Sequence, residues 1–120
     1  MKRTEIIRAF RALLRLKDTD MPIRCAWGIY WLVEQLKPLY DSTTELEAVL
    51  FEKYGGSVIE GNITFPNTES ADAFMHEYNK MSNEDLDTKI RKVVVNFNEI
   101  GNAIMTPADI AFLHDIIQFE

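Results

Sequence analysis

The stretch PIRCAWGIYWLVEQLKPLYDSTTELEAVLFEKYGG, residues 22–56, decides the fold. A seam of mostly apolar residues recurs through it at alternating steps of three and four, the spacing of one face of an α-helix. The seam consists of Ile29, Leu32, Leu36, Leu39, Thr43, Leu46 and Leu50. Because it stays in phase across Pro38, it predicts one helix of about 30 residues, with Pro22 first and Gly55-Gly56 as its left-handed stop. Pro38 removes a hydrogen bond and crowds the preceding turn, so a kink is expected near residues 36–37.

The first half of this helix carries a second apolar face, opposite the seam. At about 100° per residue, that face is formed by Ile23, Trp27, Tyr30 and Trp31. Two interpretations stay open. The rings fill a core between helices, or Trp27, Tyr30 and Trp31 are the apolar anchors of a partner interface, a role in which tryptophan and tyrosine are enriched. Gly28 costs the helix about 1 kcal/mol relative to alanine, which predicts close approach by a neighbouring element.

The same periodicity predicts three further helices. Residues 4–16 form an amphipathic helix with Thr4 as its cap. Another starts at Asn67 or Thr68 and carries apolar residues as far as Met81. The last starts at Thr106 with a proline and an acid in its first turn, and its core-facing residues are Ile110, Leu113, Ile116 and Ile117.

Two segments favour β-structure. Residues 57–59 and 62–65 flank Glu60-Gly61 and read as a hairpin. Residues 91–97 are rich in valine and predict a strand that could join the hairpin in a three-stranded sheet. The expected fold is one α+β domain over residues 1–120, mainly helical. A kinked long central helix is packed by three further helices, and a small antiparallel sheet lies at one end.

Composition narrows the class of protein. The chain has 120 residues, of which 47% are hydrophobic, enough for one domain with a buried core. Its longest apolar stretch, residues 25–33, is far shorter than the roughly 20 residues of a membrane span, and no signal-peptide core is present. We therefore expect a soluble cytoplasmic protein without membrane association. The lone Cys25 cannot form an internal disulfide and is expected to be a small buried residue.

No set of side chains has the spacing of a catalytic or metal site. His76 follows Asp72 by four residues, but the second histidine of the zinc-protease pattern is missing. His114 lies on the last helix without a serine or cysteine partner. Residues 83–87 lack the glycine and the closing glutamate of a calcium loop, and a solvated acidic loop is the default. The chain is therefore predicted to be no enzyme and to need no cofactor.

Charge is unevenly distributed along the chain. Residues 1–24 hold seven basic and three acidic groups, a net of +4, whereas the remainder has six basic and 16 acidic groups, a net of −10. Arg8, Arg11 and Arg15 share the polar side of the first helix. This basic face is a solvated surface, a track for a phosphate backbone, or a contact for an acidic protein. A pI near 4.9 and the absence of interleaved aromatic residues disfavour nucleic acid.

Four groups of residues carry a resemblance: Met21-Pro22-Ile23, Glu52-Lys53-Tyr54-Gly55, residues 81–95, and Thr106-Pro107-Ala108-Asp109. In the order of their elements they resemble a group of small bacteriophage proteins of unknown function. The resemblance covers most of the chain and implies no catalytic residue. It implies a phage or prophage origin, and so either a component or accessory of the virion or a small protein that binds a host factor, for example a defence enzyme.

These observations lead to one expected function and two alternatives. The leading expectation is a non-enzymatic phage protein that acts through protein–protein contacts, such as an inhibitor or adaptor of a host factor. One alternative is a structural or assembly accessory of the virion, and a second is a nucleic-acid-binding accessory that uses the basic face. The partner is expected to be a protein, self-association is open, and the location is the host cytoplasm or the virion.

Overall fold

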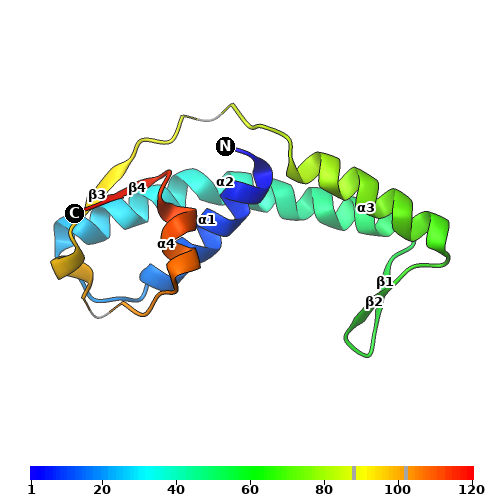
Figure 1. The fold of residues 1–120 in the computed structure, drawn as a ribbon, viewed down its shortest axis with the longest axis horizontal. Helices are drawn as coiled ribbons and strands as arrows, with labels where there is room; N and C mark the ends of the chain where they lie inside the picture. Colours follow the sequence, from blue (N-terminus) through cyan, green and yellow to red (C-terminus); the bar gives the residue numbers. More distant parts are fainter. Residues whose placement is uncertain (88, 102) are drawn as a thin grey trace.

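The computed structural model describes residues 1–87, 89–101 and 103–120. Its longest element, α2 (Ile23–Lys53), runs along most of the length of the molecule (Figure 1). The prediction of one continuous helix across Pro38 is confirmed, and the kink stays a prediction. Pro22 caps the helix instead of occupying its first turn, because its ψ of 146° is extended. At the other end Gly55 takes a φ of +68°, the left-handed conformation that stops the helix.

Helix α1 (Arg3–Leu16) packs along the first half of α2 and buries its apolar side there. It begins at Arg3, so Thr4 is not its cap. The exposed helix start is instead closed by Glu5, whose Oε1 accepts a hydrogen bond from the Lys2 backbone N–H at 3.0 Å. Cys25 lies in this core as predicted, and burial raises the pKa of its thiol.

The core is concentrated at this end of the molecule. Helix α1 contributes Ile6, Ala9, Phe10, Ala12, Leu13 and Leu16; α2 contributes Cys25, Ile29, Leu32 and Leu36; the C-terminal part contributes Val95, Ile100, Leu113, Ile116 and Ile117. The seam of α2 follows this distribution: Leu36 is fully buried, whereas Leu46 is 38% exposed. Heptad spacing therefore predicted the buried side of α2 correctly, but its second half has less to pack against.

The C-terminal part closes the core in a way that differs from the prediction. Strand β3 (Val93–Val95) pairs in parallel with β4 (Ile117–Phe119), and between them lie the 3₁₀-helix η1 (Phe97–Ile100) and helix α4 (Pro107–Leu113). Residues 93–95 therefore do not join the hairpin, so the three-stranded form of the predicted sheet is wrong, whereas the hairpin itself is antiparallel as predicted. Helix α4 packs mainly on α1, not on α2, and ends at Leu113, so Ile117 reaches the core from a strand.

The start of α4 was predicted in detail. Thr106 Oγ1 accepts from the Asp109 backbone N–H at 3.2 Å, and Asp109 Oδ2 accepts from the Thr106 backbone N–H at 3.0 Å. This reciprocal pair is a capping box, and Pro107 occupies the first helical turn.

The opposite end of the molecule is built from α3 (Thr68–Ser82), which packs on the second half of α2, and from the hairpin of β1 (Ser57–Ile59) and β2 (Asn62–Thr64). Asn67 caps α3 by accepting from the Ser70 N–H at 2.8 Å. No residue of α3 is fully buried. Four rings hold this end together, with centroids 5.0–6.2 Å apart: Phe51, Phe65, Phe74 and Tyr78.

The acidic segment after α3 returns along the N-terminus. Glu84 Oε2 accepts a hydrogen bond from Arg3 Nε at 3.0 Å, and Asp85 Oδ1 lies 3.2 Å from the N-terminal ammonium group. Residues 83–87 are thus partly engaged in ion pairs and not simply solvated. Among the described residues, no helix is both long and apolar enough to cross a membrane.

Candidate functional site

The second apolar face of α2 is open to solvent. Ile23, Trp27, Tyr30 and Trp31, here called the aromatic face, are 85%, 67%, 54% and 49% exposed. The interpretation that these rings fill a core is therefore wrong for the isolated chain. Helix α1 packs on the side of α2 that carries Leu32 and Leu36, and no second helix covers the opposite side among the described residues.

The rings of this face are arranged as one surface. The Trp27 and Tyr30 centroids are 5.8 Å apart with ring planes tilted by 35°. Ile23 and Ala26 complete a shallow apolar hollow of about 290 Å³ beside these two rings. Because the rings are held on a rigid helix, they form a ready-made patch that loses little conformational freedom on binding.

A groove runs along one flank of the aromatic face. It has a volume of about 550 Å³ and is lined by Trp27, Gly28, Trp31, Gln35, Arg91, Lys92 and Val93. Its walls come from α2 and from the segment that enters β3. Gly28 lets these two elements meet, since an added Cβ would lie 2.5 Å from Val93 Cγ1. The close approach predicted at Gly28 is therefore confirmed, and β3 is the approaching element.

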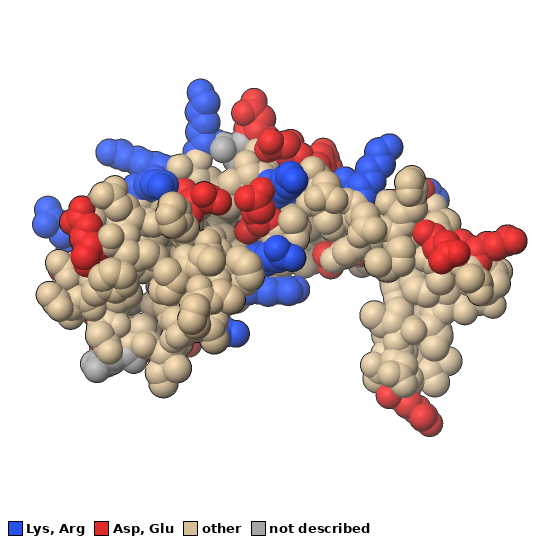
Figure 2. All heavy atoms as spheres, viewed as in Figure 1, with Lys and Arg blue, Asp and Glu red and all other residues tan. Residues whose placement is uncertain are grey.

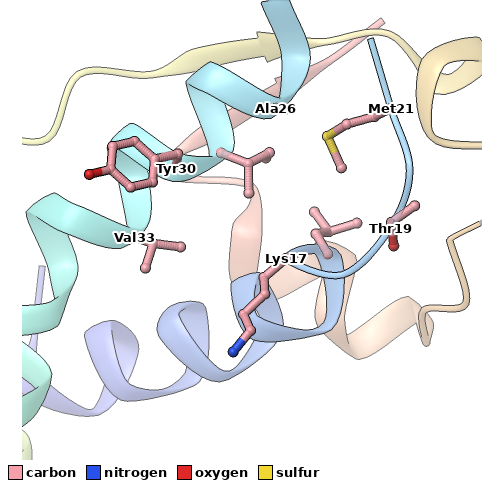
Figure 3. Close-up of a pocket in the computed structure, with 8 residues that line it drawn as sticks. Lys17, Thr19, Met21, Ala26, Tyr30 and Val33 are labelled. Carbon is pink, nitrogen blue, oxygen red and sulfur yellow. The ribbon is translucent and has the colours of Figure 1, made fainter. Parts of the chain in front are cut away.

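An apolar pocket of about 190 Å³ lies on the other flank (Figure 3). Its lining residues come from α2 and from the turn between α1 and α2: Leu16, Lys17, Thr19, Met21, Ala26, Ile29, Tyr30 and Val33. The ring of Tyr30 forms part of the wall, and its hydroxyl group points away from Met21 (Figure 3). The aromatic face thus lies between two concave features, which are the shapes that receive the side chains of a partner.

The groove is positively charged on its β3 side. Lys89, Arg91 and Lys92 are exposed, and residues 89–98 contain no acidic group. Basic side chains gather at this end of the molecule, over the segment that leads into β3 (Figure 2). Within the described part of the chain, neither Arg91 nor Lys92 has a carboxylate partner. Both charges are available to a partner.

The predicted basic face of α1 is only partly free. Arg15 donates from Nη1 to Asp109 Oδ2 at 2.7 Å, and the guanidinium group of Arg8 lies 5.5 Å from the centre of the Phe112 ring. Both contacts fasten α4 to α1. Arg11 alone of the three has neither an ion pair nor a ring contact within the described residues. Arg8 and Arg15, two of the three cations predicted to bind a partner, therefore also stabilise the packing of α4 on α1.

Sequence reasoning missed Arg91 and Lys92 as site residues. The basic run was visible, but its position depends on the parallel pairing of β3 with β4, which brings residues 91–93 beside α2. His76 and His114 are exposed. Among the described residues, no group of three or more histidine, cysteine, aspartate or glutamate side chains is arranged to hold a metal ion.

Comparison with protein-family models gives no match, and no curated protein or solved structure is significantly similar to this chain.

Proposed function

We propose that this chain is a non-enzymatic protein that acts by binding another protein through the aromatic face. The observation that carries the proposal is the exposure of Trp27, Tyr30 and Trp31, each about half or more open to solvent on one side of a rigid helix. Contiguous exposed apolar surface of this kind marks interaction sites in soluble proteins. Tryptophan and tyrosine are also among the residues that contribute most to binding free energy.

The surroundings of the face support a protein ligand over a small molecule. The groove and the pocket on its two flanks both open to solvent, which lets them receive the side chains of a helix or strand. Arg91 and Lys92 at one edge favour a partner whose own edge is acidic there. Apolar contacts at the centre with charges at the rim form the usual anatomy of a specific interface.

For the biological setting we propose a phage or prophage protein. The resemblance to small bacteriophage proteins supports this origin. The partner is then either a host factor, such as a defence enzyme, that the chain inhibits or links to another protein, or a virion protein beside which it assembles. The corresponding location is the host cytoplasm or the particle.

The test is a quantitative binding measurement after capture. The wild-type chain is used to retain proteins from infected and uninfected host cells, and a retained protein is then purified and titrated. We expect Trp27→Ala to raise its dissociation constant by about 30-fold, the factor that corresponds to an interface residue contributing about 2 kcal/mol.

Met75→Ala is the matched control, because Met75 is 49% exposed, like Trp31, but lies on α3. It should leave the dissociation constant within about twofold, the size of a change of less than 0.5 kcal/mol. An equal loss for both variants, or none for Trp27→Ala, would show that the aromatic face is not the binding site.

A further inference from the structure

The hairpin forms an arm that leaves the body of the molecule beyond the end of α2 (Figure 1). Its branched apolar side chains are open to solvent: Val58 is 65%, Ile59 58% and Ile63 66% exposed. Val58 and Ile63 are register partners and so share one face of the ribbon. A two-stranded hairpin is at best marginally stable in water, so this arm gains from being covered.

The opposite end of the molecule offers a place of matching character. The groove has the exposed indole rings of Trp27 and Trp31 on one wall and Val93 on the other. A pair of branched aliphatic side chains fits the apolar surface between them. The β1–β2 ribbon is extended, and an extended segment can bind in an open groove beside a short strand such as β3.

The segment around the arm and the β3 rim of the groove have opposite net charges. Residues 52–72 hold four acidic groups, including Glu60 at the tip of the arm, against Lys53 alone, a net of −3. Residues 89–93 hold three basic groups and no acid, a net of +3. Head-to-tail contact between two copies therefore brings unlike charges together. Face-to-face contact of two grooves would instead oppose Arg91 and Lys92 to their own copies, which costs binding free energy.

We propose that the occupant of the groove is a second copy of this chain. The arm of one copy lies between Trp27, Trp31 and β3 of the next, with Val58 and Ile63 inside and Glu60 beside the basic rim. The arm cannot reach its own groove, because about 24 residues of α2, or about 36 Å, separate the two. A contact of this heterologous kind repeats, so the copies form an open chain or close into a ring.

This inference rests on the proposed function, since it uses the same face and names its partner. Sedimentation velocity tests it with the full chain over about 1 μM to about 1 mM, which covers the dissociation constants of small interfaces. The arm variant carries Val58→Thr and Ile63→Thr, which keep β-branching. The groove variant carries Trp27→Gln and Trp31→Gln, and Met75→Gln is the control of matched exposure.

We expect the wild type and the control to grow with concentration beyond a dimer, and each double variant alone to stay monomeric. A mixture of the two variants should give a 1:1 heterodimer, because one supplies an intact groove and the other an intact arm. A wild type that stays monomeric, or an arm variant that still associates, overturns the proposal. If the wild type stays monomeric while Trp27→Ala still weakens binding of another protein, self-association fails and the proposed function stands.

Discussion

The contact between Gly28 and Val93 allows a prediction for the substitution Gly28→Ala. Its effect on the free energy of unfolding should change sign when Val93 is also replaced. In the wild type, a methyl group at position 28 would lie 2.5 Å from Val93 Cγ1, closer than real side chains approach. Overpacking of this kind costs about 1–3 kcal/mol, whereas alanine in place of a helical glycine gains about 1 kcal/mol. We therefore expect Gly28→Ala to destabilise the wild type by about 1 kcal/mol.

In a Val93→Ala background the same substitution should be stabilising. The clash involves Cγ1, and the next atom, Val93 Cβ, is 3.7 Å from the added methyl group, which is an ordinary contact. Removing Cγ1 leaves the helix-propensity gain of about 1 kcal/mol without the clash. The two backgrounds should then differ by about 2 kcal/mol in the effect of Gly28→Ala.

Urea unfolding followed by far-UV circular dichroism measures this cycle. A change of 1 kcal/mol moves the midpoint by about 0.5 M at the slopes usual for a chain of this size. The cost of Val93→Ala itself cancels, because only the effect of the second substitution is compared. If Gly28→Ala has the same effect in both backgrounds, within about 0.5 kcal/mol, β3 does not pack on Gly28 as described.

Two further predictions concern the core and one ion pair. In urea unfolding, Leu36→Ala should lower the free energy of unfolding by about 3–5 kcal/mol, because Leu36 is fully buried. Leu46→Ala should lower it by less than about 1 kcal/mol, because Leu46 is 38% exposed. Equal losses would contradict the unequal burial of the two halves of α2. Glu77 accepts hydrogen bonds from Tyr54 at 2.6 Å and from Lys53 at 3.2 Å, and these lower the pKa of its carboxyl group. The charged carboxylate therefore stabilises the fold above the ordinary carboxyl pKa, and this stabilisation is lost as the pH falls through the lowered pKa. Tyr54→Phe should raise the Glu77 pKa in a carbon-detected NMR titration, and an unchanged pKa would refute this assignment.

The elements that sequence predicts well are those whose signals are local. The three-and-four spacing from Ile29 to Leu50 depends only on neighbouring turns of one helix, and Thr106 with Asp109 closes its cap within three residues. Glu60-Gly61 needs two positive φ angles, which the structure shows at 51° and 80°. Each of these signals can be identified without knowing how the rest of the chain folds.

The features that sequence misses depend on distant partners. The ladder between β3 and β4 joins residues 24 apart, such as Val93 and Ile117, and Ile117 fits a helical spacing as well as a strand. Arg15 and Asp109 are 94 residues apart, so nothing near either one signals their pairing. For the same reason, spacing could place Trp27 on a second apolar face but could not say whether the chain has another element to cover it.

The concentration of buried side chains at one end has a consequence for motion. No residue of α3 is fully buried and the hairpin side chains are mostly exposed, so we expect this end of the molecule to open at a lower free energy than the core around α1. Backbone amide hydrogens of α3 and the hairpin should therefore exchange with deuterium through local opening, whereas those of α1 should exchange only through global unfolding. If copies associate through the arm as proposed, this local opening would let neighbouring copies meet at a range of angles while the packed end stays unchanged.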